Sequence, residues 1–334
     1  MMIFDLYNPY ANQAVTRHYV DVIAEGIVSA GGAVEPIEKI ERDKSNASKG
    51  IVVISPFDVL RARIAGYRRV LFWSQGLSAE ESFMRNKSKA KFRVIKTLTK
   101  MALRRADLTF LVSKAMQDYY RDSYGVTLES AVVMPCFNEE LEDAPLAEGE
   151  KPGNVFLYAG GLAPWQCFEN TVELYRLIEQ RVGDASLLVL VEDRDRARRI
   201  LEDAGVQRFE LDYVSREQLT ERIKDVRFGF CLREDDPVNN VATPTKLSTY
   251  VVNGIIPICS RAVVDFCNVS SESRAVVQIA GVTASDEEKD LIVGLCEHPL
   301  SREEVRRDFA EHFKDYYSRK TYVDAIAGQV GNLV

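Results

Sequence analysis

The sequence has only three histidines among 334 residues, and its six cysteines form no Cys-x-x-Cys pair and have no histidine nearby at ligand spacing. We therefore expect neither a metal site nor a cysteine–histidine hydrolase. No apolar run approaches the roughly 20 residues that a membrane-spanning helix needs. The N-terminal stretch MMIFDLYNPY lacks the basic region and the small-residue cleavage site of a signal peptide. These absences predict a cytoplasmic protein.

A surplus of basic charge is also missing, since the net charge is −7, which argues against a nucleic-acid partner. The charge is uneven: residues 1–136 carry +6, and the remaining 198 residues carry −13. Between the two parts lies EELEDAPLAEGEKPG, an acidic stretch with two prolines and two glycines that is typical of a linker. We therefore predict two domains, residues 1–140 and 154–311, joined by a linker over 141–153.

Short apolar runs alternate with helical patterns in both halves. Strands are predicted at 3–6, 33–37, 51–54, 70–73, 108–112, 131–134, 155–159, 186–191, 208–213, 228–232, 255–259 and 275–279. Helices are predicted at 14–30, 56–66, 87–105, 114–124, 167–182, 194–204, 215–224, 244–253, 285–297 and, as one long pattern, about 301–328. Continuous Val/Ile/Leu strands joined by helices predict an α/β fold of two Rossmann-like, doubly wound parallel-sheet domains. Two such domains should face a cleft, with ligands beyond the carboxyl ends of the strands.

The helix predicted at 244–253 has a lysine in its first turn. Thr243 suits the N-cap, Pro244 the first helical position and Gly254 the position after the helix. Lys246 is then the third helical residue, where the helix dipole disfavours a cation and a capping box prefers Glu or Gln. A lysine there is explained if an anion such as a phosphate binds at the helix start. The alternative is that Lys246 merely extends into solvent.

Other polar patterns are weaker signals. Gly160 and Gly161 follow a strand and fit a tight turn near a phosphate, although no GxGxxG motif is present. The Asp193-Arg194-Asp195 triplet could hold a divalent metal, but it precedes a helical pattern and more plausibly caps a helix.

Four segments carry a resemblance to a known family. They are FWSQGLSAEES at 72–82, ADLTFLVSKAMQDYY with VVMPCFN at 106–138, FLYAGGLAPWQCFEN at 156–170 and VATPTKLSTYVVNGIIPICS at 241–260. Together they resemble the GT-B glycosyltransferases, specifically the retaining glycosyltransferase family four type of bacterial capsule and O-antigen pathways. The resemblance implies that part of the C-terminal helix, about 312–330, crosses back to the first domain.

The resemblance also implies an activity, the transfer of a hexose-type unit from a nucleoside diphosphate sugar to a glycan acceptor that is lipid-linked. The transfer would retain configuration and need no metal or other cofactor besides the sugar nucleotide as co-substrate. Arg233 and Lys246 would supply the catalytic positive charge. The implied donor-binding residues are Gly160, Gly161, Trp165, Gln166, Asn239, Asn240, Thr243, Pro244, Thr245, Thr249 and Tyr250. The implied acceptor-side residues are Asn8, His18, Gln75, Gly76 and Ser113.

Departures from the family pattern keep alternatives open. Family members commonly have two glutamates spaced ExxxxxxxE, and the matching positions here are Val241 and Thr249. An Arg-and-Lys pair common in the family is replaced by APWQ at 163–166. The alternatives are a non-catalytic nucleotide-sugar-binding partner of another transferase and a sugar-nucleotide epimerase of similar fold. Arg233 could also be a surface residue of the acidic run REDD, and His18 a structural histidine.

Residues 82–106 contain nine basic residues and no acidic one. Phe92, Ile95, Leu98 and Met101 add an apolar stripe at helical spacing. A basic amphipathic helix over 85–105 suits the anionic inner face of the plasma membrane, as in a peripheral membrane protein. The alternative is that the stripe faces the core of the domain.

Overall fold

The computed structural model describes residues 1–9, 14–141 and 151–333, and the chain separates into two compact units. The first unit contains residues 1–138, 240–243 and 318–334, and the second contains residues 139–239 and 244–317. Most of the predicted linker, residues 142–150, lies outside the described residues. The division places 240–243 in the first unit, whereas the sequence suggested that the whole of 154–311 belongs to the second domain.

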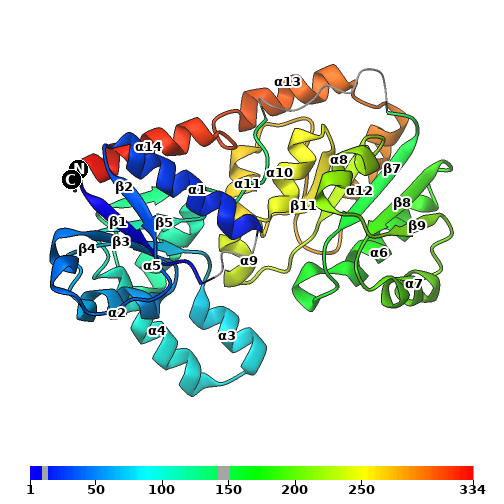
Figure 1. Cartoon of the computed structure of the whole chain (residues 1–334). Helices are drawn as coiled ribbons and strands as arrows, with labels where there is room; N and C mark the ends of the chain where they lie inside the picture. The colour runs from blue at the N-terminus through cyan, green and yellow to red at the C-terminus, as the bar shows by residue number, and fades with distance from the viewer. Residues whose placement is uncertain (10–13, 142–150, 334) are drawn as a thin grey trace. The chain divides into compact units, whose positions relative to one another are not determined.

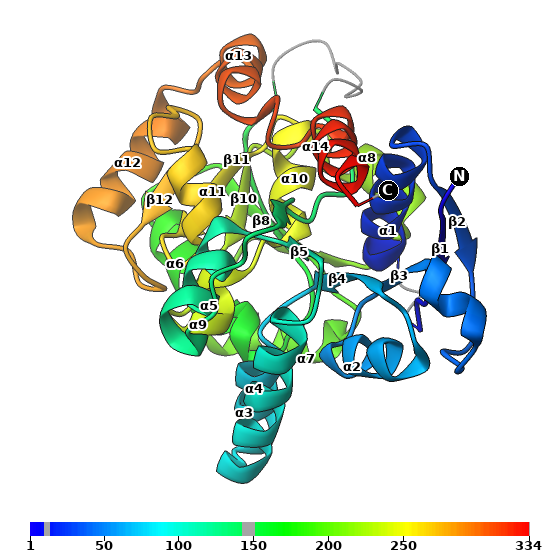
Figure 2. The same ribbon diagram turned by 90° about the vertical axis from the view of Figure 1, so that its left-hand side faces the viewer.

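The first unit is built on a six-stranded, fully parallel sheet in the order β2-β1-β3-β4-β5-β6. Its strands are β1 (Ile3–Leu6), β2 (Ala33–Pro36), β3 (Gly50–Val53), β4 (Arg69–Ser74), β5 (Leu108–Leu111) and β6 (Ala131–Val133). Its helices are α1 (Ala14–Ser29), η1 (Lys44–Ser48), α2 (Pro56–Ala65), α3 (Ser78–Asn86), α4 (Lys89–Leu103), α5 (Lys114–Tyr124) and α14 (Arg319–Gly331). Helices α1 and α14 cover one face of the sheet, and α2 and α4 lie on the other (Figures 1 and 2).

The second unit is built on another six-stranded parallel sheet, in the order β12-β11-β10-β7-β8-β9. Its strands are β7 (Asn154–Ala159), β8 (Ala185–Leu190), β9 (Phe209–Asp212), β10 (Phe228–Cys231), β11 (Ile256–Ser260) and β12 (Val277–Ile279). Its helices are η2 (Pro164–Gln166), α6 (Phe168–Glu179), α7 (Arg194–Asp203), α8 (Arg216–Ile223), α10 (Thr245–Val252), α11 (Val264–Val269), α12 (Asp286–Glu297) and α13 (Arg302–Phe313); α9 (Pro237–Val241) spans the division between the units.

The predicted fold class is confirmed, because both sheets are parallel and every predicted strand is present. Central strands are buried along their whole length, as β3, β5, β10 and β11 show, which explains their continuous apolar sequence. Many helices begin at a serine N-cap in extended conformation, for example Ser55, Ser88 and Ser113, whose side chains accept a backbone N–H from the first turn.

The predicted long C-terminal helix is two helices, so that expectation was wrong. Helix α13 ends at Phe313, and Ser318 caps the new helix α14 by accepting the backbone N–H of Thr321. Helix α14 belongs to the first unit and lies along α1. The two helices approach closely at Gly26, where a Cβ would lie 2.5 Å from Cγ2 of Ile326. Glycine is therefore required at this crossing for space.

We predict that Gly26→Ala destabilises the protein by about 1–2 kcal/mol. Overpacking a close contact typically costs about 1–3 kcal/mol, and the higher helix propensity of alanine offsets part of this cost. The matched control is Gly328→Ala in α14, where no atom lies within 4 Å of the added Cβ. That variant should be stabilised by up to about 1 kcal/mol. Urea unfolding followed by circular dichroism measures both, and shifts in the same direction would contradict the close crossing.

Candidate functional site

The strand order of the second sheet reverses between β7 and β10. The chain runs from β7 outward to β8 and β9, and then returns to β10 on the other side of β7. Loops that follow the two strands at such a switch point leave in opposite directions and open a crevice at the carboxyl ends of the strands. Gly160 directly follows β7, and Arg233 is the second residue after β10, so both lie at this edge.

Two cations meet at one amide oxygen at this edge. Gln166 Oε1 accepts from Arg233 Nη2 at 2.9 Å and from Lys246 Nζ at 3.4 Å. The Lys246 ammonium also lies over the ring of Tyr158, 4.8 Å from its centroid. Three of the residues that the sequence singled out are thus brought together by elements far apart in the chain. We call Arg233 and Lys246 the cation pair, and the side-chain amide of Gln166 the bridging amide.

Arg233 is buried, with 5% of its surface exposed, and hydrogen bonds hold both its backbone and its guanidinium. Its backbone N–H donates to Ser260 Oγ at 2.9 Å, and Ser260 in turn donates to the carbonyl of Gly281 at 2.7 Å. Its guanidinium donates to the carbonyl of Leu232 at 2.8 Å as well as to Gln166. The alternative that Arg233 is a surface residue of the acidic run was wrong.

Gly160 borders the same site and is required there for two reasons. Its φ of +144° is a backbone conformation that residues with a Cβ rarely adopt. An added Cβ would also lie 3.3 Å from Lys246 Nζ and 3.7 Å from Gln166 Oε1. A side chain at this position would therefore crowd the Lys246 ammonium and the Gln166 amide.

The electrostatics of the site are unbalanced. Burial lowers the pKa of Lys246 to about 8, and the neighbouring Arg233 guanidinium adds to this shift. The sequence did not single out Tyr158, which reads as a core aromatic of β7. Its ring lies under Lys246, and its hydroxyl donates to the carbonyl of Gly161 at 2.6 Å. A buried ammonium beside a guanidinium, with a neutral amide between them, is an arrangement suited to bind an anion.

The helix that carries Lys246 starts one residue later than the sequence predicted. Pro244 is the N-cap of α10, so Lys246 is the second helical residue and not the third. Thr243 is not a cap, because its Oγ1 accepts the backbone N–H of Cys136 at 3.0 Å. The capping-box part of the argument for Lys246 was therefore wrong, whereas its proximity to the helix start remains. Thr245 is the first helical residue.

Several predicted donor-binding residues have structural roles instead. Tyr250 is fully buried, and its hydroxyl donates to the carbonyl of Phe230 at 3.2 Å, so its side chain belongs to the core. Thr249 is also buried, and its hydroxyl donates to Thr245 one turn earlier at 3.4 Å. Asn239 bonds to the carbonyl of Glu234 and to Asp236 within its own loop. Asn240, like Thr243, belongs to the first unit.

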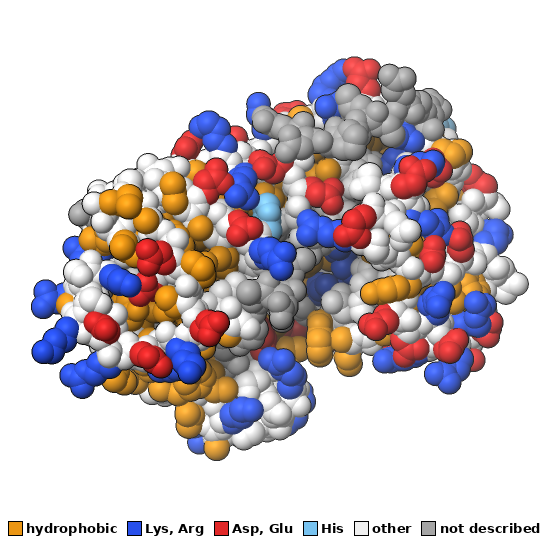
Figure 3. Space-filling model, viewed as in Figure 1, with side chains coloured by type: hydrophobic (Ala, Val, Ile, Leu, Met, Phe, Trp, Pro, Cys, Tyr) orange, Lys and Arg blue, Asp and Glu red, His pale blue; other side chains and the backbone are white. Residues whose placement is uncertain are grey.

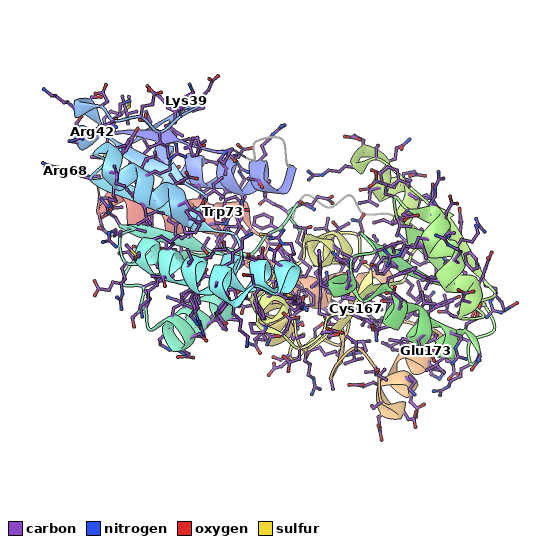
Figure 4. The ribbon with its side chains drawn as sticks, turned by 90° about the horizontal axis from the view of Figure 1, so that it is seen from below. Lys39, Arg42, Arg68, Trp73, Cys167 and Glu173 are labelled. Carbon is purple, nitrogen blue, oxygen red and sulfur yellow. The ribbon has the colours of Figure 1, made fainter. Side chains whose placement is uncertain are left out.

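The loop between β7 and α6 presents a different surface. Trp165 is 44% exposed in the short helix η2, and Gly161 has open space around it. Cys167, labelled in Figure 4, begins α6 with a φ of +52°, an uncommon conformation for a residue other than glycine.

The predicted acceptor-side residues lie in the first unit and separate into different environments. Ser113 is buried and is the N-cap of α5; it accepts from Met116 N and donates to the carbonyl of Val241 at 2.7 Å, so it is structural. His18 is half-buried and packs edge-to-face on Phe137 at 4.9 Å. Asn8 lines a surface pocket of about 640 Å³ beyond β1 and β2, with Tyr7, Arg17 and Glu38 among its neighbours.

Gln75 and Gly76 follow β4 directly, at the carboxyl edge of the first sheet. Gln75 is exposed, and the carbonyl of Gly76 accepts from the hydroxyl of Tyr120 at 3.4 Å. Trp73, two residues earlier in β4, is buried against Tyr19 (Figure 4).

Among the described residues, no group of three or more His, Cys, Asp or Glu side chains is placed to hold a metal ion. Asp193 is the N-cap of α7 and accepts the backbone N–H of Arg196 at 3.0 Å, as the capping interpretation predicted. The Asp193–Asp195 triplet is thus accounted for as a helix start.

The sequence matches no protein-family model and no curated protein. The structure is similar to that of the sucrose-phosphate synthase from Thermosynechococcus elongatus, with a TM-score of 0.68 and 14% identity over 100% of this chain and 98% of that one. It is also similar to the lipopolysaccharide outer core galactosyltransferase WaaB, with a TM-score of 0.68 and 12% identity over 100% of both chains. The chain has the GT-B fold.

A third similar structure contains a nucleotide. It is a mutant of TarM from S. aureus in complex with fondaparinux, alpha-GlcNAc-glycerol and UDP, with a TM-score of 0.60 and 10% identity. The match covers 84% of this chain, which spans 55% of the length of TarM.

We predict that Lys246→Met stabilises the protein at pH 7. The folded-state pKa of about 8 lies below the ordinary 10.5, so below pH 8 the fold bears the full cost of a buried ammonium. That cost disappears as the pH rises from 8 towards 10.5. The gain should therefore be about 1–3 kcal/mol at pH 7 and become much smaller at pH 10.

Urea unfolding of the wild type and the variant at both pH values measures this difference. The exposed Lys89 serves as the control, since Lys89→Met should change the free energy of unfolding little at either pH. A Lys246→Met gain of equal size at pH 7 and pH 10 would show that the ammonium is not the cause.

Proposed function

We propose that the protein is a glycosyltransferase that moves a sugar from a nucleoside diphosphate sugar to a glycan acceptor. The observation that carries this proposal is the pair formed by Arg233 and Lys246 on Gln166, at the switch point of a sheet in a GT-B fold. Helix N-termini and paired cations at such a point are suited to a diphosphate. The UDP bound to TarM is consistent with a nucleotide of this class.

The chemistry follows from where charge develops. As the bond between the sugar and the diphosphate breaks, negative charge grows on the departing phosphate oxygens, and preorganised cations stabilise that charge. Arg233 is held by Ser260 and Leu232, whereas the partners of Lys246 among the described residues are Gln166 and the Tyr158 ring. We propose that these two cations supply the charge that a metal would supply elsewhere, that the transfer retains configuration, and that the acceptor is lipid-linked as in capsule or O-antigen synthesis.

A second candidate is a nucleotide-sugar-binding protein without transferase activity. This candidate is favoured by Val241 and Thr249, which stand where the glycosyltransferases that the sequence resembles commonly have glutamates. Val241 is buried, with its carbonyl engaged by Ser113, and Thr249 bonds within its own helix. Neither position offers a carboxylate to a ribose. Release of nucleoside diphosphate from a sugar nucleotide distinguishes the two candidates, because only a transferase hydrolyses its donor slowly.

We predict that Lys246→Ala lowers turnover about 100–1000-fold, because one well-placed donor to a developing anion contributes roughly 2.7–4 kcal/mol. Nucleoside diphosphate release is measured with UDP-, GDP-, ADP- and dTDP-sugars, and affinity by the thermal shift that each free diphosphate causes. Both readouts should survive EDTA, because the cation pair replaces a metal in this proposal.

The control is Lys224→Ala, an exposed lysine of the same unit paired with Glu221, which should leave both readouts within about twofold. Near-normal turnover and nucleotide affinity in Lys246→Ala would place the anion site elsewhere. Loss of turnover in EDTA, restored by manganese or magnesium, would overturn the metal-independent part of the proposal.

We further propose that the α3–α4 hairpin, residues 78–103, rests on an anionic membrane surface. No helix among the described residues is long and apolar enough to cross a bilayer. The hairpin projects from the rest of the first unit in both ribbon views, and basic and hydrophobic side chains appear together on it (Figures 1, 2 and 3). Val94 is 58% exposed and Met101 37%, while Thr99, Ala102 and Leu103 anchor the base of α4.

We predict that the triple change Lys89→Glu, Lys91→Glu and Arg93→Glu abolishes co-sedimentation with phosphatidylglycerol vesicles. All three side chains are exposed, and the new acidic residues at 89 and 91 in the first turn of α4 favour the helix, so the fold should be retained. Binding of the wild type should weaken as salt rises, because ions screen exposed charges.

The matched control carries the same change of charge at Lys39, Arg42 and Arg68, three exposed residues of the first unit outside the hairpin (Figure 4). This control should still sediment with the vesicles. Equal loss of vesicle binding in both variants would show that the net charge of the protein, and not the hairpin, causes the binding. Unchanged vesicle binding of the hairpin variant would refute the membrane proposal.

A further inference from the structure

Two cysteines of the second unit place their sulfur atoms side by side. Cys259 lies in β11 and Cys267 in α11, and their Sγ atoms are 3.8 Å apart. Both are free thiols; Cys259 is fully buried, whereas Cys267 keeps 6% of its surface exposed. A disulfide needs an S–S distance of about 2 Å. A small movement of α11 against β11 therefore suffices to bring the two sulfur atoms within bonding distance.

The surroundings of the two thiols make one of them the more reactive. The hydrogen bond from Cys259 and the charge of Arg261 hold the pKa of the Cys267 thiol below its usual value, although burial opposes this effect. The same hydrogen bond, together with burial, raises the pKa of the Cys259 thiol. A thiol reacts as its thiolate, so Cys267 is the better nucleophile of the pair. Cys259 is then in place to attack Cys267 once Cys267 is oxidised.

Ser260 connects these two thiols to the cation pair. It directly follows Cys259 at the end of β11, and its carbonyl accepts from the Cys267 sulfur at 3.5 Å. Its hydroxyl accepts the backbone N–H of Arg233 at 2.9 Å. A bond between Cys259 and Cys267 would remove the S–H donor and draw the end of β11 towards α11. The hydrogen bond that holds the backbone of Arg233 would change with it.

We propose that Cys259 and Cys267 form a reversible disulfide in the presence of a hydroperoxide, and that this disulfide weakens anion binding at the cation pair. The first part is independent of any transferase activity, whereas the second part rests on the proposed function. In reducing compartments such disulfides are usually transient and redox-sensing.

The oxidation takes two steps. The Cys267 thiolate attacks one oxygen of hydrogen peroxide, the O–O bond breaks, and the released hydroxide takes up the proton of that thiol to become water. The Cys259 sulfur then attacks the sulfenic acid on Cys267, the S–O bond breaks, and a second water leaves with the Cys259 proton. The two thiols thus lose two electrons, and one peroxide is reduced to two waters.

Peptide mapping of the full chain identifies the linkage. Trypsin cleaves after Arg261, so Cys259 and Cys267 fall into separate peptides, and Cys231 falls into a third. After treatment with hydrogen peroxide and blocking of the remaining thiols, mass spectrometry should show peptides 247–261 and 262–274 joined, with the loss of two hydrogen atoms. Dithiothreitol should separate them. Separate peptides only, or Cys259 joined to Cys231, its neighbour in β10, would overturn the proposal.

The effect on the cation pair is measured by the thermal shift that free nucleoside diphosphates cause before and after oxidation. The oxidised wild type should bind the diphosphate at least about fivefold more weakly, the loss expected when one hydrogen bond is broken. Dithiothreitol should restore the affinity. Cys267→Ala should keep its affinity in peroxide. The control is Cys136→Ala, which removes a half-buried thiol of the first unit and should lose affinity as the wild type does.

The outcomes separate the two parts of the proposal. Linked peptides without a change in diphosphate affinity would overturn the connection to Arg233. Equal loss of affinity in oxidised Cys267→Ala would assign that loss to another thiol and would overturn the connection as well. If the reduced wild type binds no nucleoside diphosphate and hydrolyses no sugar nucleotide, the proposed function fails. The peptide map of the wild type still decides the disulfide in that case, and it needs no variant to fold.

Discussion

The reversal of strand order between β7 and β10 is the constraint on which the candidate site depends. The chain adds β8 and then β9 on one side of β7. It then returns and places β10 on the opposite side of β7. The segments that follow β7 and β10 consequently share one edge of the sheet and diverge from it. Gln166 arrives from the first of these segments, and Arg233 and Lys246 from the second. No other pair of adjacent strands in this described sheet offers that divergence.

The neighbouring strand supports the same edge. Ser260 ends β11, which pairs with β10, and its hydroxyl holds the backbone of Arg233 while donating to Gly281 beyond β12. Three successive strand ends are linked in this way, so the guanidinium is positioned by the sheet itself. Lys246 is held less firmly, by an amide and a ring face from the β7 side. A rigid cation and a more adaptable one suit an anion whose charge moves from one oxygen to another.

The strands and the fold class were predictable because buried parallel strands leave uninterrupted apolar runs. Lys246 and Arg233 were predictable as candidates because a cation at a helix start and a basic residue after a strand are local features. Their meeting at Gln166 was not, because it depends on side-chain contacts between segments far apart in the chain. Tyr250 was misjudged because a Tyr in the helix that carries Lys246 is equally compatible with a core position and with a ligand contact, and the space left by Gly229 places its ring in the core. Helix α3 was missed because its short, charged sequence lacks a side-chain cap.

The electrostatic imbalance at the cation pair would favour an anion as the ligand of the proposed site. Gln166 contributes one partially negative oxygen to two positive groups, and no described carboxylate lies within ion-pair distance of Arg233 or Lys246. A carboxylate there would raise the pKa of Lys246 and repel a phosphate, whereas an amide does neither. A bound diphosphate would supply the missing charge, restore the pKa of Lys246 towards its ordinary value and secure its proton. The buried ammonium of Lys246 would thus lower the stability of the empty fold, and a bound anion would recover the stability lost there.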